Sequence, residues 1–369
     1  MNIFAKMKNA KYVQKFIIPL VISLALIVAG VIMTCVKGLN LGIEFTGGIK
    51  ISVDANDVTD KKEFESTLRK WLEGDRGVDE ETGETQNPDG KKFEIKNVTI
   101  NGSNYVVVLG TSMTENGKKV NMLTTKVKFT SGTDEITGYV AQRETQEINS
   151  QLTTYLQNKY NAGVNVSASF VGNESAKWVL KSAIIAVAVA IAVILVYIAI
   201  RFTLLSGVAA ILSLIHNVLI MFACTSLFQI SVNQTFIAAI VTIIGYSINS
   251  TIVVFDKIRE LLKRPSYKDT TDVDIANEAI GATLKRTLLT TLTTLVMIVL
   301  LAIFGTQAIR EFAYPIIFGL IAGAYSSILL AAPTWVYLRK WFKQADKKPV
   351  QKKKKAKNTD NKPVVAENA

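Results

Sequence analysis

Polar side chains that could guide an ion recur along two otherwise apolar stretches of the chain. In the first stretch they follow the spacing i, i+4, i+7, i+14, which places them on one helix face, and they are Thr242, Tyr246, Asn249 and Asp256. The second stretch repeats a helical spacing and has a cation at its start, and its residues are Thr283, Arg286, Thr287, Thr290 and Thr294. Polar groups at membrane depth need partners, so we expect the two faces to meet inside a helix bundle. Interhelical hydrogen bonding and an ion path or gating seam both explain such a pair.

Proton transfer would need a group that titrates near neutral pH, and the apolar stretches offer only His216, the single histidine. Asn217 follows it, and Ser250 follows Asn249. Asp256 lies beside Lys257 and Arg259, where an ion pair is the simpler interpretation. Arg286 keeps its charge at every relevant pH, so it can act only as a counter-charge. We therefore expect any titrating acid to come from a partner, with this chain supplying a neutral polar wall and Arg286.

Six runs of about 20 apolar residues are long enough to cross a hydrocarbon core about 30 Å thick as helices. They are Phe16–Val36, Val179–Ile200, Ser206–Phe228, Thr235–Phe255, Thr287–Phe304 and Phe312–Leu338. Small residues predict close helix packing at Gly245, Gly319 and Gly323. The sequence thus predicts a polytopic α-helical membrane protein.

Charge is concentrated outside these runs. The 369 residues carry a formal net charge of +12, with 49% hydrophobic residues and a mean hydropathy of +0.28. Lys and Arg gather before the first run, between the fourth and fifth, and after the sixth. The positive-inside rule explains this pattern and predicts that both termini are cytoplasmic, so we expect no nucleic-acid partner. The expected order is a basic N-terminus (1–15), a first span (16–36), an extracytoplasmic α+β domain (37–178), a five-helix membrane domain (179–340) and a basic, disordered tail (341–369) that attracts membrane lipid.

The predicted extracytoplasmic domain has the pattern of a ferredoxin-like fold. Ile49, Ile51 and Val53 alternate with polar residues, as in a half-buried strand. A helix with Phe64, two strands around 93–109, a helix over 139–160 and a last strand near 164–170 complete the order β-α-β-β-α-β. Residues 111–132 have no clear assignment. Gly47 and Gly48 allow a sharp turn between the first span and this domain.

Three sequence motifs resemble the SecF branch of the SecD/SecF protein-export family, within the resistance-nodulation-division superfamily. Glu44-Phe45-Thr46-Gly47-Gly48 is similar to the family's Gly-Gly signature. The segment from Gly245 to Glu260 is similar to its fourth-span motif, and the segment from Asn277 to Thr287 is similar to the motif that opens the fifth. The similarity extends over about residues 10–340.

This resemblance implies an accessory subunit of the Sec translocase. Such a subunit pairs with SecD, works beside the SecYEG translocon, and uses an ion gradient, such as the proton motive force, to promote late export of preproteins across the bacterial cytoplasmic membrane. The family commonly has Asp where this chain has Ser250, and often His-Asp where it has His216-Asn217. Both intramembrane carboxylates of the family pattern are therefore missing.

Two other classes of function need weighing. A stand-alone small-molecule exporter of the same superfamily usually has twice as many spans, so this chain would have to act as a dimer. An enzyme is not expected, because the sequence shows no phosphate-binding loop, zinc-ligand spacing or nucleophile motif. No cofactor or metal is expected either.

Overall fold

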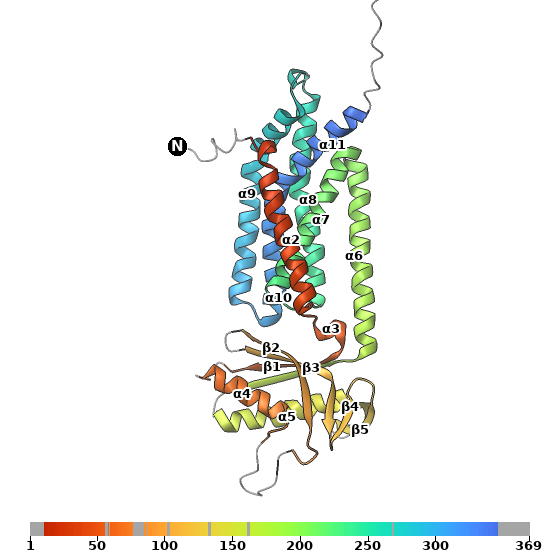
Figure 1. Ribbon diagram of the computed structural model, residues 1–369, viewed down its shortest axis with the longest axis vertical. Helices are drawn as coiled ribbons and strands as arrows, with labels where there is room; N and C mark the ends of the chain where they lie inside the picture. The colour runs from red at the N-terminus through yellow and green to blue at the C-terminus, as the bar shows by residue number, and fades with distance from the viewer. Residues whose placement is uncertain are drawn as a thin grey trace, which may run out of the picture.

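The computed structural model describes residues 11–55, 58, 60–76, 85, 87–101, 104–131, 134–160, 163–267 and 269–345. The described residues form a bundle of long helices with an α+β domain at one end (Figure 1). Six of the helical segments are long and apolar enough to cross a membrane. The predicted class, a six-span membrane protein with one α+β domain after the first span, is confirmed.

The membrane bundle is built from helices that run beyond the apolar stretches into charged residues at their ends. Its elements are η1 (Val13–Lys15), α2 (Ile17–Lys37), α6 (Asn173–Arg201), α7 (Leu204–Leu227), α8 (Gln234–Lys263), η2 (Pro265–Tyr267), α9 (Asp272–Phe304), α10 (Gln307–Ser326), the π-helical turn η3 (Ser327–Ala331) and α11 (Ala332–Ala345). The third and sixth spans are the most buried, whereas α2, α6 and α9 expose most of their apolar surface, as helices in contact with lipid do.

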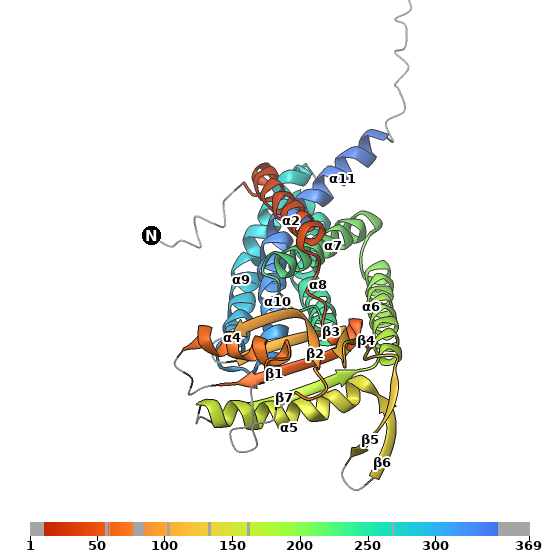
Figure 2. The same cartoon turned by 60° about the horizontal axis from the view of Figure 1, so that its bottom comes forward.

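The α+β domain has a five-stranded antiparallel sheet, with β2-β3-β1-β7 in order and β4 also paired with β3. Its elements are the short helix α3 (Ile43–Thr46), β1 (Gly48–Asp54), α4 (Lys61–Leu72), β2 (Lys92–Asn101), β3 (Asn104–Glu115), β4 (Lys118–Asn121), β5 (Lys126–Ser131), β6 (Asp134–Tyr139), α5 (Val140–Tyr160) and β7 (Asn165–Val171). This is the predicted ferredoxin-like order. Residues 111–131, unassigned from the sequence, extend β3 and form β4 and β5; β5 pairs with β6 in a separate ribbon (Figure 2).

The alternation along β1 decides which way the sheet faces. Ile49, Ile51 and Val53 are fully buried against α4 and α5. Lys50, on the opposite face, reaches Glu311 at the start of α10. Because successive side chains of a strand point to opposite faces, one strand carries both the domain core and a contact with the membrane bundle.

Glycine makes the turn from the first span into the sheet possible. Gly47 has φ +69° and Gly48 has φ +130°, both in the region that favours glycine. A Cβ on Gly47 would lie 3.0 Å from the Leu123 side chain and 3.3 Å from the Val171 carbonyl oxygen. The chain therefore reverses within two residues while packed against β7.

A buried ion network holds α5 against the far end of the sheet. Lys91 Nζ lies 3.2 Å from Glu144 Oε1 and 2.5 Å from Glu147 Oε2. Arg143 also pairs with Glu144, at 2.6 Å. Burial raises the pKa of Glu144, and the charge of Glu147 adds to this, while Lys91 and Arg143 oppose it. The two cations thus offset part of the cost of burying this nearly inaccessible carboxyl group.

Lys91→Met should destabilise this domain by about 2 kcal/mol at neutral pH, because Glu144 loses one of its two cationic partners. Because the pKa of Glu144 is raised in the folded state, its protonated form adds stability at low pH, and this stability is lost as the pH rises through that pKa. Protonated Glu144 does not need Lys91 as a partner. The variant's loss should therefore shrink on acidification. Pulse proteolysis of the full chain in mild detergent would measure it. Lys128→Met, at an exposed pair 4.0 Å from Glu135, is the matched control and should change stability by less than about 0.5 kcal/mol. Equal losses in both variants would contradict the argument.

Candidate functional site

The two polar stripes come together along the middle of α8 and α9. Tyr246, Asn249 and Ser250 on α8 and Arg286, Thr287 and Thr290 on α9 line a small cavity of about 20 Å³. The hydroxyls of Tyr246 and Thr287 are buried there without a hydrogen-bond partner. Unpaired hydroxyls are costly at membrane depth, so the contact is incomplete within this chain.

Several stripe residues, including two that line this cavity, lie on an open flank, whereas the sequence predicted them inside the bundle. Thr242, Asn249 and Thr290 are exposed, and Thr294 is half-buried. The Thr242 hydroxyl donates to the Ala238 carbonyl at 2.8 Å, and Thr290 and Thr294 make the same kind of bond within α9. Bonding back to the helix removes the need for a partner in this chain.

Arg286 is exposed at the edge of this flank, and no carboxylate among the described residues forms an ion pair with it. Ser250 is half-buried and donates to the Ser247 carbonyl at 3.3 Å. The flank therefore combines a single fixed cation with neutral hydroxyl and amide groups. A second protein surface carrying a carboxylate would complement it.

His216 and Asn217 lie elsewhere, in a network through the centre of the bundle. Asn217 is fully buried, and its amide nitrogen donates to Ser247 Oγ at 2.5 Å. Its oxygen therefore faces His216 Nδ1, at 3.2 Å, and Nε2 of the ring lies 3.1 Å from the Tyr325 hydroxyl. Both ring nitrogens are thus paired, which ties α7 to α8 and α10. The sequence did not reveal that this network and the stripes occupy different faces of α8.

Asp256 forms the ion pair expected from its neighbours, but with an additional residue from another helix. Its carboxylate lies 2.7 Å from Arg201 Nη2, at the end of α6, and 3.4 Å from Arg259 Nη2. The Arg259 guanidinium also donates to the Arg201 carbonyl oxygen at 3.3 Å. These contacts join α6 to α8 at the end of the bundle opposite the α+β domain.

The three glycines predicted to pack helices differ in their surroundings. A Cβ on Gly319 would lie 2.6 Å from Ile243 Cγ1, and one on Gly323 would lie 3.1 Å from Ser247 Oγ, so α10 and α8 approach closely there. Gly245 is exposed, and a Cβ would meet no atom within 4 Å. Its packing role finds no counterpart within the described chain.

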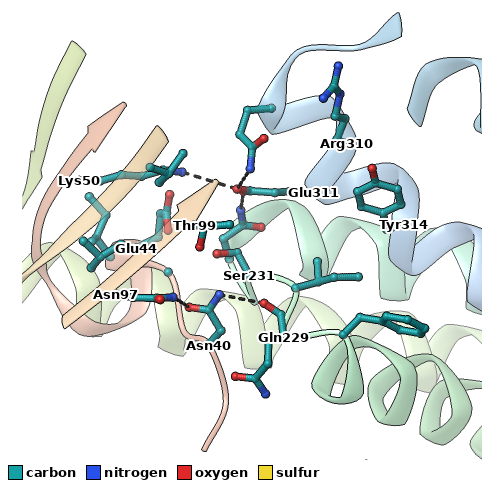
Figure 3. Close-up of a pocket in the computed structure, with 18 residues that line it drawn as sticks. Asn40, Glu44, Lys50, Asn97, Thr99, Gln229, Ser231, Arg310, Glu311 and Tyr314 are labelled. Atoms are coloured by element: carbon teal, nitrogen blue, oxygen red, sulfur yellow. Dashed lines mark hydrogen bonds and ion pairs between the residues drawn. The ribbon is translucent and has the colours of Figure 1, made fainter. Parts of the chain in front are cut away.

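A polar junction between the α+β domain and the bundle was not anticipated from the sequence. Glu311, only 6% exposed, accepts from the Asn233 side chain at 2.5 Å and from Gln307 at 3.0 Å. Lys50 Nζ lies 3.9 Å away, and Figure 3 shows these groups pointing toward one another. Asn233 also caps α8 by accepting from the Phe236 amide. One asparagine thus fixes both a helix start and the carboxylate.

Main-chain contacts continue this junction around a cavity of about 100 Å³. Leu41 and Val232 form a short parallel bridge, and Asn40 receives a hydrogen bond from Asn97 at 3.0 Å (Figure 3). Glu44, at the start of α3, has one buried oxygen without a partner. In the sequence, two features pointed to this junction: Asn233, which can cap a helix, and the acidic Glu311 next to the sixth apolar run. Residues of both kinds are common on protein surfaces, so neither predicted the junction.

Comparison with known proteins agrees with this architecture. Residues 151–341 match the family profile described as "Protein export membrane protein SecD/SecF, C-terminal", and residues 32–56 match the SecD/SecF GG motif. SecF of Calditerrivibrio nitroreducens is 30% identical over 332 residues, which cover 90% of this chain and 94% of the relative. This chain belongs to the SecD/SecF family.

Other members of the family are longer. SecDF of Bacillus subtilis is 33% identical over 86% of this chain, yet the match covers only 36% of the relative. The crystal structure of SecDF from Thermus thermophilus superposes with a TM-score of 0.66 at 28% identity, covering 89% of this chain and 38% of that one. This SecD/SecF-family chain therefore corresponds to somewhat more than a third of these SecDF proteins. The resemblance inferred from the sequence motifs is confirmed.

The central network gives a stability prediction for the membrane bundle. Asn217→Ala should lower stability by about 1–2 kcal/mol, because it removes the hydrogen-bond partner of Ser247 Oγ and of His216 Nδ1 in the bundle centre. Thr242→Ala is the matched control, since that hydroxyl bonds only its own helix, and it should change stability by less than about 0.5 kcal/mol. Unfolding of the purified chain in mixed micelles would measure both. A neutral Asn217→Ala variant would show that the network does not hold the helices together.

Proposed function

We propose that this chain is an accessory subunit of the Sec protein translocase, which pairs with SecD and promotes late export of preproteins beside SecYEG, driven by an ion gradient. The observation that carries the proposal is the flank of α8 and α9 in a chain of this family, where Arg286 is exposed beside the buried, unpaired hydroxyls of Tyr246 and Thr287. In SecDF relatives, a single chain contains additional sequence beyond the region matched here. SecD would supply the corresponding partner for this flank.

In this proposal the membrane contact provides the ion-dependent step. A SecD carboxylate would face Arg286, with Asn249, Ser250 and Thr290 forming a neutral wall around it. A fixed cation favours the charged form of a nearby acid. Uptake and release of a proton or cation by the SecD carboxylate would therefore depend on its distance from Arg286. Neither Ser250 nor Asn217 can titrate, which is why the acid is assigned to the partner.

The junction at Glu311 would carry that change to the α+β domain. Glu311 lies in the second turn of α10, and α10 packs along both α8 and α9. Lys50 joins the same carboxylate to β1. A shift of α8 against α9 would therefore move α10, and the contact between Glu311 and Lys50 would pass that movement to β1 of the sheet.

The orientation proposed here places the α+β domain outside the cytoplasmic membrane. The start of α2 with the preceding η1, the end of α8 with its link to α9, and α11 lie at the end of the bundle opposite this domain (Figure 1), and they carry Lys15, Lys263, Arg264 and Arg339. Fewer basic residues lie at the domain end, among them Lys37, Lys177, Lys181 and Arg310. The positive-inside rule then assigns that end and both termini to the cytoplasm.

Cysteine labelling tests this orientation in intact cells. In a Cys35→Ala/Cys224→Ala background, Lys118→Cys in β4 should react with a membrane-impermeant maleimide. Ser266→Cys in η2 should react only after the cells are opened. The opposite pattern would reverse the topology.

Arg286 provides the functional test. Arg286→Ala should slow gradient-dependent translocation at least tenfold in vesicles containing SecD and SecYEG, while the complex with SecD still assembles. Arg286→Lys should restore translocation partly, because lysine returns the positive charge but not the planar guanidinium group that can bind a carboxylate through two hydrogen bonds. Lys285→Ala, the neighbouring exposed cation, is the control and should stay near the unmodified rate. Unchanged translocation in Arg286→Ala would exclude a counter-charge role, and purification of a homodimer without SecD would favour the exporter alternative.

A further inference from the structure

A third cavity lies at the end of the bundle opposite the α+β domain. It has a volume of about 380 Å³ and opens beside the link between α6 and α7. Its apolar lining comes from three elements and includes Phe202, Phe255, Ile258, Leu262 and Trp335. Phe202 and Phe255 meet edge to face, with ring centroids 5.9 Å apart, so the wall is firmly packed. Neither the stripes nor the junction uses this cavity.

Two arginines line the same cavity. Arg259 comes from α8, and its side chain is 43% exposed, with contacts of 3.4 Å to Asp256 and 3.3 Å to the Arg201 carbonyl oxygen. Arg339 comes from α11, packs over Trp335 with its guanidinium carbon 5.2 Å from the ring, and lies 3.0 Å from Asp272. An apolar wall and two guanidiniums within one cavity suit a ligand that has an apolar chain and an anionic group.

The local charge stays positive after the visible pairs are counted. Arg201, Arg259 and Arg339 face the carboxylates of Asp256 and Asp272. Three cations against two anions leave one positive charge beside the cavity. Arg259 is the most exposed of the three arginines and therefore the cation most available to an added anion.

The position of the cavity matches the boundary of a bilayer. Ile200 and Leu204, on either side of the link, are 83% and 80% exposed, as lipid-facing residues are. On α11, Tyr337 and Trp341 are also exposed, and aromatic residues of these types favour the membrane interface. The apolar and charged parts of the cavity therefore lie where acyl chains and headgroups meet.

We propose that this cavity binds one anionic phospholipid, with an acyl chain against Phe255, Ile258 and Leu262 and the phosphate between Arg259 and Arg339. Guanidinium groups match phosphate oxygens, and a phosphate in this position would link α8 to α11, beside the ion pairs that already join α6 to α8 and α11 to α9. The chain's own segment after residue 345 is not a suitable occupant. Its sequence is rich in lysine and would repel the arginines.

The proposal rests on the membrane location and not on a role in protein export. It is tested with the purified full chain by native mass spectrometry in detergent containing phosphatidylglycerol or phosphatidylcholine. One phosphatidylglycerol should remain bound where phosphatidylcholine is lost. Arg259→Gln and Arg339→Gln should each weaken retention about fivefold, the factor that corresponds to the ~1 kcal/mol contributed by one cation at an anionic membrane surface. Lys340→Gln removes a charge next to Arg339 but outside the cavity lining, and retention should be unchanged.

A second measurement locates the lipid even if an arginine variant folds poorly. Trp335 is only 3% exposed, so brominated acyl chains should quench it only from inside the cavity. In vesicles with brominated phosphatidylglycerol, the unmodified chain should show a quenched component that is absent from Trp335→Phe. Brominated phosphatidylcholine should not produce it.

Three results would overturn the proposal. Equal retention of both lipids would show an apolar groove without headgroup selection. Displacement of the lipid by millimolar inorganic phosphate would show a site for free phosphate. Equal weakening in Lys340→Gln would show attraction to surface charge in general.

Discussion

Hydrocarbon offers no hydrogen-bond partners, and this constraint explains where the polar side chains of the bundle lie. Some, such as Thr290, bond a carbonyl of their own helix and can remain exposed. Asn217 and Ser247 pair across helices and are fully enclosed. Tyr246 and Thr287 have buried hydroxyls that find no partner in this chain. The last pair lies beside the open flank, which is why the flank is better explained as an interface than as a lipid-facing surface.

The same constraint shapes the connection to the α+β domain. Where the bundle ends, carboxylate and amide groups can be buried again because the sheet supplies a cation. Lys50 is available for this because β1 points its apolar residues the other way. Glu311 is thereby held by groups from β1, from the start of α8 and from α10 itself. The domain thus contacts the bundle through polar groups around one carboxylate, and also through Phe45, which packs against apolar residues of the bundle.

Much of the fold could be predicted from the sequence because its signals are local. Apolar length gave the six spans, and the alternation along 49–53 gave a strand with one buried face. Residues 111–131 resisted assignment because β4 and β5 are short and mainly polar, and each pairs only with a neighbouring strand, β4 with β3 and β5 with β6.

The candidate site was only partly predictable. Helical spacing correctly placed Tyr246 and Asn249 on a common face that meets Thr287. It could not separate His216 and Asn217 from that face, because the direction in which α7 presents them depends on its packing against α8 and α10. The junction at Glu311 was missed for a similar reason, since its residues come from segments more than 70 positions apart in sequence.

The central claim is that the flank of α8 and α9 is completed by SecD. It is tested most directly by placing a photo-crosslinking amino acid at Asn249 in cells that contain both proteins, with Val31 on α2, an exposed apolar position, as the control. The account predicts a crosslinked product with SecD from position 249 and none from position 31. A product from position 249 that contains only a second copy of this chain, or no protein adduct at all, would contradict it.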